Sequence, residues 1–225
     1  MDPMIETTSL SKCYRQGDTE VKALDRVSVK MDPGEFVALM GPSGSGKTTL
    51  LNIMAGVDKP TSGKIMVAGR DLGALNDAQL TAWRTRGIGY IFQFYNMIPV
   101  LTAFENVELP LLMLKLTKKE RAEHVMTALA AVGITALAGR FPRQLSGGQE
   151  QRVAIARAIV TDAQILVADE PTGNLDVESE KEIMTVLAAL NARFQKTIVI
   201  VTHDAVAAAF AGRTIRLEKG RIVSN

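Results

Sequence analysis

One eight-residue segment constrains this chain more than any other. Residues 41–48 read Gly-Pro-Ser-Gly-Ser-Gly-Lys-Thr and fill every fixed position of the pattern G-x-x-x-x-G-K-[ST]. Residues 36–40 before it form an apolar run typical of a strand, and residues 50–54 after it carry apolar side chains at helical spacing up to Gly56. A glycine-rich loop between a strand and a helix is the context that this pattern requires. We therefore expect an α/β fold built around the loop.

The same loop predicts a phosphate-binding site. Its glycines allow several backbone N–H groups to face one phosphate, and the following helix adds a partial positive charge. Lys47 is placed to reach the outer phosphates of a nucleotide, and Thr48 offers a hydroxyl to a magnesium ion. A plain glycine-rich turn is disfavoured because a strand and a helix flank the loop in register. The nucleotide-binding residues predicted here are Gly41, Pro42, Ser43, Gly44, Ser45, Gly46, Lys47, Thr48 and Thr49.

A second acidic element is needed to handle a magnesium-bound triphosphate, and residues 165–170 supply it. The apolar run Ile-Leu-Val-Ala ends in Asp169 and Glu170. Adjacent carboxylates on an extended segment point in different directions. Asp169 is therefore expected to hold the water shell of the metal, while Glu170 faces an attacking water.

Residues 145–149, Leu-Ser-Gly-Gly-Gln, form a second glycine-rich turn that runs into a helix expected to begin near residue 149 and to continue through Arg157. The start of such a helix is also suited to an anion. Because the first loop already holds the phosphates of its own copy, we expect this turn to close on nucleotide held by another copy. That predicts a head-to-tail dimer with two-fold symmetry and nucleotide at the interface. The binding residues predicted in this turn are Ser146, Gly147, Gly148 and Gln149.

The first two thirds of the chain predict strands followed by helices. Alternating apolar residues at 27–31 and the short segment 64–68 are typical of strands. From about residue 94 to residue 160 the pattern is mostly helical. Within it, Thr117 and Glu120 have the spacing of a capping box, which marks the start of a helix.

The last third predicts a strand, a helix and a strand. These lie at residues 165–169, 178–194 and 197–202, and parallel pairing through a crossover helix is the natural arrangement. Residues 214–224 alternate around a Lys-Gly turn, which predicts a closing hairpin. The whole pattern indicates an α/β core interrupted by a helical insertion.

Composition limits the partners and the location. The chain has 225 residues, 47% of them hydrophobic and 22% charged, which is typical of a folded globular protein. Its formal charge of +2 is too small to make nucleic acid the default partner. The single cysteine, Cys13, excludes an internal disulfide and a cysteine-based zinc cluster. Residues 1–11 lack the apolar core of a secretory signal, so we expect no export and contact with a membrane only through a partner.

Together these motifs resemble the ATP-binding subunit of ABC transporters. The phosphate loop, the second turn, Asp169, Glu170 and His203 occur in the family's order over essentially the whole chain. The resemblance implies a RecA-like P-loop NTPase core, an N-terminal antiparallel β subdomain and an inserted helical subdomain at about residues 94–160. It implies a single nucleotide-binding domain over residues 1–225, with ATP and Mg²⁺ as cofactors.

The resemblance also implies roles for individual residues. Gln93 looks like the Q-loop glutamine that senses the metal and the coupling region, and residues 173–176 resemble the D-loop that links opposed sites. His203 is expected to contact the γ-phosphate, and Tyr14 to stack on adenine. The implied catalytic residues are Glu170, His203 and Gln93, and the implied metal-binding residues are Thr48, Gln93 and Asp169.

Residues 94–110 carry a narrower resemblance, to the macrolide-export and lipoprotein-release ATPases. Those ATPases work with membrane permeases, which implies an integral membrane permease docked near residues 93–112 and a place on the cytoplasmic face of the inner membrane. Glu150 and Gly212 depart from the family's usual Gln and acidic residue, but neither position touches metal or phosphate. The resembling positions are Asn96, Pro99, Leu101, Thr102, Glu105, Asn106, Val107, Leu109, Pro110 and Asn174.

Other functions share parts of this pattern. A regulatory ATPase of the cell-division type has the same ATP chemistry and signals through its permease without transport. A soluble ABC ATPase acting on DNA or ribosomes is disfavoured, because the chain lacks a coiled-coil insertion, a second nucleotide domain and zinc-type cysteines. A guanine-nucleotide switch is disfavoured as well, since no Asn-Lys-x-Asp element follows the phosphate loop.

Overall fold

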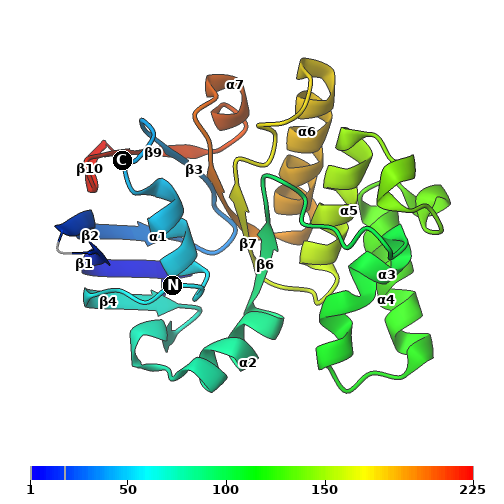
Figure 1. Cartoon of the computed structure of the whole chain (residues 1–225), viewed down its shortest axis with the longest axis horizontal. Coiled ribbons are helices and arrows are strands. Elements are labelled where there is room, and N and C mark those ends of the chain that lie inside the picture. The colour runs from blue at the N-terminus through cyan, green and yellow to red at the C-terminus, as the bar shows by residue number, and fades with distance from the viewer. Residues whose placement is uncertain (1, 18, 225) are drawn as a thin grey trace.

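The computed structural model describes residues 2–17 and 19–224, and it contains two β-sheets with helices around them (Figure 1). One sheet has the strand order β2-β1-β4-β5, and the other has the order β10-β9-β3-β8-β7-β6. The two ends of the predicted domain, residues 1 and 225, lie outside the described residues.

The first sheet is antiparallel. Strand β1 (Ile5–Gln16) pairs with β2 (Thr19–Met31) on one side and with β4 (Ser62–Val67) on the other, and β5 (Arg70–Asp71) extends the sheet beyond β4. Buried and exposed residues alternate along the second half of β2, so one face of the sheet packs on the core while the other meets solvent. This is the N-terminal antiparallel layer expected from the resemblance.

The second sheet carries the predicted crossover. The strands β3, β8, β7 and β6 are parallel neighbours, β9 pairs parallel with β3, and β10 pairs antiparallel with β9. The parallel pair β7–β8 and the closing hairpin β9–β10 are therefore confirmed. The bounds are β3 (Phe36–Met40), β6 (Ile88–Ile91), β7 (Ile165–Asp169), β8 (Thr197–Val201), β9 (Arg213–Glu218) and β10 (Arg221–Ser224).

Each face of the second sheet has its own hydrophobic core. Along β3, Val37 and Leu39 pack with helix α1 (Lys47–Met54) and the first sheet, whereas Phe36 and Ala38 pack with the helices on the opposite face. That opposite face is covered by α5 (Gly147–Ile159) and α6 (Val177–Phe194). Because both faces are covered, β3, β7 and β8 are buried along nearly their whole length.

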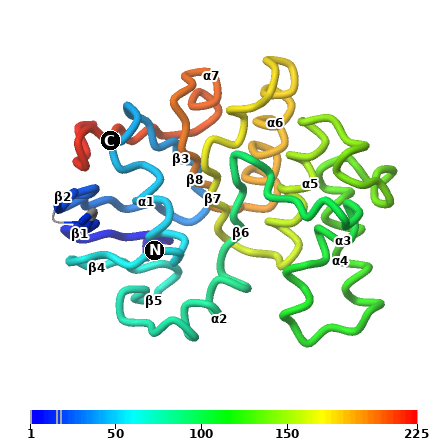
Figure 2. The backbone as a smooth tube through the Cα atoms, in the orientation of Figure 1, coloured from blue at the N-terminus to red at the C-terminus, as the bar shows by residue number. Residues whose placement is uncertain are grey.

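Between β6 and β7 the chain is mostly helical from residue 103 onward. It forms the green segment that Figures 1 and 2 show at the end of the molecule opposite the first sheet. Thr117 and Glu120 make the predicted capping box, with Thr117 N donating to Glu120 Oε2 at 2.7 Å. The elements are α3 (Ala103–Glu108), η2 (Leu109–Met113), α4 (Lys118–Ala131), η3 (Thr135–Leu137), η4 (Pro142–Gln144) and α5.

The remaining helices are short, and Trp83 is part of one of them. Its side chain is buried, as is that of Leu80 on the same helix, so Trp83 belongs to the hydrophobic core. None of the helices formed by residues 2–17 and 19–224 combines the length and the apolar character needed to cross a lipid bilayer. The remaining short helices are η1 (Leu72–Ala74), α2 (Asp77–Gly87), which carries Trp83, and α7 (Ala205–Ala208).

Candidate functional site

A cleft of about 780 Å³ lies where the first sheet, the phosphate loop and the carboxyl ends of β7 and β8 meet. Crevices at the carboxyl ends of parallel strands are the usual ligand sites of α/β sheets. The predicted residues that line this cleft are Tyr14, Gly41, Pro42, Ser43, Gly44, Ser45, Gly46, Lys47, Thr48, Thr49, Gln93, Asp169, Glu170 and His203. The structure therefore brings residues from five distant segments to one place.

The backbone of the phosphate loop requires glycine at two crowded positions. Gly41 has φ 145° and Gly46 has φ 98°, and both values lie in the region that disfavours other residues. A Cβ on Gly41 would lie 2.0 Å from Leu217 O, and one on Gly46 would lie 2.4 Å from Ala23 O. Close backbone packing therefore holds the loop in place and directs the first turn of α1 into the cleft.

The interior of the loop is polar and buried. Lys47 Nζ donates to Gly41 O at 2.8 Å and to Pro42 O at 2.9 Å, and only 7% of the residue is exposed. Ser45 Oγ is also buried and has no hydrogen-bond partner among the described atoms. A cation and an unpaired hydroxyl inside a glycine cradle fit a phosphate group, which would offer oxygen atoms to both.

Thr48 and Asp169 form the candidate metal site. Thr48 Oγ1 donates to Asp169 Oδ1 at 3.1 Å, so a hydroxyl and a carboxylate meet at the floor of the cleft. Burial raises the pKa of the Asp169 carboxyl, as does the neighbouring Glu170 carboxylate, against the opposing hydrogen bond from Thr48. No group of three or more His, Cys, Asp or Glu side chains gathers within the described residues. Few protein ligands, all oxygen, fit Mg²⁺, which keeps several waters and binds substrate phosphates.

Glu170 turns away from Asp169. Its φ is 49°, in the left-handed region, and its backbone N–H donates to Val201 O at 2.9 Å, so the chain bends directly after β7. Glu170 Oε2 lies 2.6 Å from His203 Nδ1, which follows β8. The two adjacent carboxylates therefore have separate partners, one the hydroxyl of Thr48 and the other the imidazole of His203.

Gln93 lies in the turn after β6, beside the residues that resemble a D-loop. Asn174 Nδ2 donates to Gln93 O at 3.1 Å. Gly173 packs so closely that a Cβ there would lie 3.2 Å from Gln93 Nε2 and 3.5 Å from Glu170 Oε2. Segments 81 residues apart thus meet at the acidic end of the cleft.

Tyr14 lines the cleft from β1. Its side chain is exposed, and its Oη donates to Asp58 Oδ2 at 2.6 Å. Burial of part of the ring raises the pKa of the Tyr14 phenol, and the bond to Asp58 adds to this effect. The phenol is therefore protonated near neutral pH and acts as the donor.

The second turn lies apart from this cleft. Helix α5 begins at Gly147, two residues before the expected start, because Ser146 Oγ accepts from Gln149 N at 3.3 Å and Gln149 Oε1 accepts from Ser146 N at 3.0 Å. This capping box organises the first turn of the helix. Of the described residues that line the cleft, none comes from segment 146–149.

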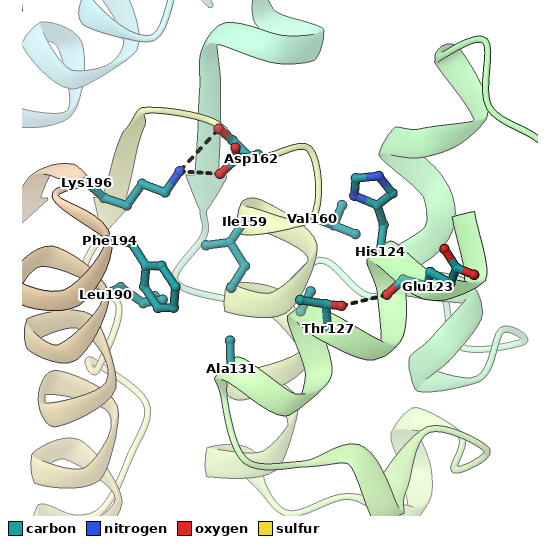
Figure 3. Close-up of a pocket in the computed structure, with 11 residues that line it drawn as sticks. Glu123, His124, Thr127, Ala131, Ile159, Val160, Asp162, Leu190, Phe194 and Lys196 are labelled. Atoms are coloured by element: carbon teal, nitrogen blue, oxygen red, sulfur yellow. Dashed lines mark hydrogen bonds and ion pairs between the residues drawn. The ribbon is translucent and has the colours of Figure 1, made fainter. Parts of the chain in front are cut away.

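A second cavity, of about 350 Å³, lies between α4 and the carboxyl ends of α5 and α6 (Figure 3). Its walls are mainly apolar, with Ile159 on the floor and Phe194 on one side. The ion pair between Lys196 Nζ and Asp162 Oδ1, at 2.6 Å, closes one end, and His124 stands exposed at the rim. None of the predicted site residues lines this cavity.

An apolar groove runs beside Gln93 and was not predicted as a groove from the sequence. It has a volume of about 430 Å³ and includes Phe92, which stacks on Tyr90 with ring centroids 4.3 Å apart. At its edge, the guanidinium of Arg157 donates to Asn96 O at 2.6 Å and to Tyr95 O at 2.5 Å. Large exposed apolar side chains cluster in the neighbouring sequence at Phe92, Phe94, Ile98, Val100, Leu112 and Met113.

Two polar residues of the site were also missed. Asp58 binds the Tyr14 hydroxyl, and Lys12 lies over the Tyr14 ring. No local pattern marks either residue, because the contact between Tyr14 and Asp58 joins segments 44 residues apart.

Comparison with known proteins gives this arrangement a family context. A family model described as "ABC transporter" matches residues 24–173. The chain is 44% identical over 223 residues to the macrolide export ATP-binding/permease protein MacB of Hyphomonas neptunium, which covers 99% of this chain and 34% of that protein. It is 42% identical over 225 residues to the lipoprotein-releasing system ATP-binding protein LolD of Geobacter metallireducens, which covers 100% of both. The chain thus spans about a third of the first relative and the whole of the second.

Solved structures agree. A dimeric structure of MJ0796, a bacterial ABC transporter cassette, has a TM-score of 0.90 and 43% identity, and the match covers 98% of this chain and 97% of that one. A second structure of the same cassette, in a post-hydrolysis state bound to ADP and Pi, has a TM-score of 0.90 and 42% identity with the same coverage. The expected fold class is confirmed.

Proposed function

Because this chain belongs to the ABC transporter family, we propose that it binds and hydrolyses ATP as the nucleotide-binding subunit of a membrane transporter. Its permease is of the macrolide-export or lipoprotein-release type, since relatives with those names match nearly the whole chain at 44% and 42% identity. The chain lies on the cytoplasmic face of the inner membrane, held there by the permease. Residues 94–160 serve as the inserted helical subdomain of one nucleotide-binding domain.

One observation carries the proposal: a single cleft holds the glycine cradle, the Thr48–Asp169 pair and the Glu170–His203 pair. A phosphate-binding loop alone would support binding. Cleavage needs, in addition, a group that positions water and groups that stabilise the charge on the transferred phosphoryl oxygens.

The phosphate end of ATP is assigned to residues 41–49. Lys47 and the backbone N–H groups at the start of α1 hold the β- and γ-phosphates, and Lys47 gives up its two carbonyl contacts in doing so. Thr48, Asp169 and Gln93 hold Mg²⁺. When bound, the ion neutralises part of the negative charge of the phosphates. Tyr14, which lines the same cleft, stacks on adenine.

Glu170 is assigned to the water that attacks the γ-phosphate. Its carboxylate orients the water and accepts its proton as the new P–O bond forms, while the bond between the γ-phosphorus and the bridging oxygen breaks and ADP leaves. His203 Nδ1, 2.6 Å from Glu170 Oε2, holds the carboxylate in place, and the exposed imidazole is free to reach the γ-phosphate. Gln93, packed against Gly173 beside Glu170, senses the occupied site.

Two copies of the chain work together in this proposal. Segment 146–149 of one copy closes on the nucleotide held by residues 41–49 of the other, in a head-to-tail dimer. Two findings support this arrangement. The second turn lies outside the cleft of its own chain, and a solved relative at 43% identity is dimeric.

The permease is assigned to the apolar groove next to Gln93. Exposed apolar side chains gathered in one region mark an interaction surface. Arg157 ties the carboxyl end of α5 to the backbone of Tyr95 and Asn96 beside that surface, while the other end of α5 carries the second turn. Helix α5 therefore links the dimer contact to the permease contact.

The substitution Glu170→Gln tests the assignment. It removes the carboxylate that accepts the proton but keeps a similar shape, so ATP binding and dimer closure should survive while turnover falls by about 100-fold or more. The assay is size-exclusion chromatography with light scattering, with and without Mg-ATP, together with phosphate release. The expected result is an ATP-dependent dimer of the variant.

The control is Lys47→Ala, which removes the cation of the phosphate loop and should abolish nucleotide binding, and with it the dimer. A Glu170→Gln chain that stays monomeric under saturating Mg-ATP would refute the shared-site dimer. Unchanged ATP affinity in Lys47→Ala would refute the phosphate-loop assignment.

A further inference from the structure

Tyr14 is held both at its hydroxyl and over one face of its ring. The hydroxyl donates to Asp58 Oδ2 at 2.6 Å, and Lys12 Nζ lies 4.8 Å from the ring centroid. A cation over one face leaves the opposite face for another planar group. Because the hydroxyl is committed to Asp58, what the ring offers a ligand is stacking.

Asp58 holds both of these groups. Its Oδ1 accepts from Lys12 Nζ at 2.6 Å and from the backbone N–H of Lys59 at 2.7 Å, while Oδ2 takes the Tyr14 hydroxyl. Only 13% of the Lys12 side chain and 28% of the Asp58 side chain are exposed. The pair is therefore less screened by water than an ion pair on the open surface.

Asp58 is also tied to the helix that starts at the phosphate loop. Helix α1 begins at Lys47, and just beyond its end the backbone N–H groups of Val57 and Asp58 donate to Asn52 O at 2.9 and 3.2 Å. A short hydrogen-bonded path thus leads from the phosphate loop through α1 to Asp58. From Asp58 it continues to the Tyr14 ring on the first sheet.

We propose that Asp58 is a positioning residue that holds the Tyr14 ring at a set spacing from the phosphate loop, so that the ring receives the purine base of the bound nucleotide. Lys12 assists by occupying one ring face. The inference rests on the proposed function, because it takes Tyr14 as the group that stacks on the base. Asp58 acts through Tyr14 rather than by touching the nucleotide.

The test compares a ligand that has a base with one that lacks it. Binding of ADP and of inorganic pyrophosphate, each with Mg²⁺, is measured by titration calorimetry on the full chain and on Asp58→Ala. Loss of the charged hydrogen bond should raise the Kd for ADP about tenfold and leave the Kd for pyrophosphate unchanged. The matched control is Asp77→Ala, since Asp77 pairs with Lys59 Nζ at 2.8 Å on the surface and should affect neither Kd.

A second variant, Tyr14→Phe, keeps the ring and removes its hydroxyl. It should raise the Kd for ADP as Asp58→Ala does, and the double variant should add little, because both changes remove the same contact. In steady-state assays of either single variant, KM for ATP should rise while kcat stays unchanged. This is the pattern expected when the lost interaction stabilises the ground state and the transition state equally.

Equal weakening of ADP and pyrophosphate binding by Asp58→Ala would show a merely structural role and overturn the inference. Unchanged ADP binding, or fully additive effects in the double variant, would overturn it too. If Asp58→Ala does not fold, Tyr14→Phe decides in the same way. If Tyr14 does not stack on the base, as the proposed function assumes, Tyr14→Ala would leave the affinity for ADP unchanged. If Tyr14→Ala lowers the affinity for ADP but Asp58→Ala does not, only the role of Asp58 is overturned.

Discussion

Asn106 gives a sharp test of how the segment next to the apolar groove is held. The residue is completely buried on α3. Its Oδ1 accepts from Ile98 N at 2.8 Å, and its Nδ2 donates to the carbonyl oxygens of Ile98, Leu101 and Thr102 at 3.2, 3.0 and 2.9 Å. One amide side chain therefore satisfies the backbone of a loop that has no regular secondary structure.

The cost of Asn106→Ala follows from these contacts. Thr102 O keeps the backbone N–H of residue 106 at 2.9 Å, and Ile98 O keeps the backbone N–H of Leu101 at 3.1 Å. The groups left without a partner are therefore Ile98 N–H and Leu101 O. At about 1 kcal/mol for each of these two groups, the free energy of unfolding should fall by about 2 kcal/mol. For a chain of this size that corresponds to a fall in Tm of roughly 4 to 8 °C.

Urea denaturation followed by circular dichroism measures the change, and Asn174→Ala is the control. Asn174 makes one exposed bond, to Gln93 O at 3.1 Å, so its loss should change the free energy of unfolding by less than about 0.5 kcal/mol. If Asn106→Ala were no more destabilising than this control, water would be satisfying the loop and the reasoning would be wrong.

Two further substitutions test the second sheet. Burial and the adjacent Glu170 carboxylate raise the pKa of Asp169 in the folded chain. Near that pKa the folded chain binds more protons than the unfolded chain, so the contribution of Asp169 to the free energy of unfolding falls as pH rises. Without nucleotide and metal, Asp169→Asn should therefore have a higher Tm than the unchanged chain at about pH 7, and the difference should shrink towards about pH 4; a difference independent of pH would contradict the burial argument. Gly89→Ala places a Cβ 2.1 Å from Ala158 O and should lower the free energy of unfolding by about 1–3 kcal/mol. Urea titration measures the change, and an unchanged free energy of unfolding would show that β6 and α5 can move apart without cost.

Features written in neighbouring residues were predictable. The phosphate loop needs a strand, glycines and a helix in sequence, and all three appear where the pattern placed them. The start of α4 followed from Thr117 and Glu120 because a capping box spans only four residues. The start of α5 was placed two residues late because the cap, Ser146, precedes two glycines that are poor helix formers.

Contacts between distant segments were not predictable from local pattern. Gln93 and Tyr14 were assigned to the candidate site only because of the family resemblance. A glutamine after a strand and a tyrosine in a strand have many ordinary structural roles, so the local sequence does not single them out. Their partners, Asn174 and Asp58, lie 81 and 44 residues away. Which strands become neighbours in the order β10-β9-β3-β8-β7-β6 also depends on packing of the whole chain.

The contacts of Lys47 determine how the anion affinity of a Lys47→Ala variant must be interpreted. Its ammonium group neutralises two carbonyl dipoles of its own loop, Gly41 O and Pro42 O, so an arriving anion takes part in an exchange reaction rather than a simple addition. Removing the side chain deletes an anion ligand, but it also removes the two carbonyl contacts that the anion has to displace when it binds. The affinity lost in an alanine variant is therefore smaller than the strength of the lysine–phosphate contact itself.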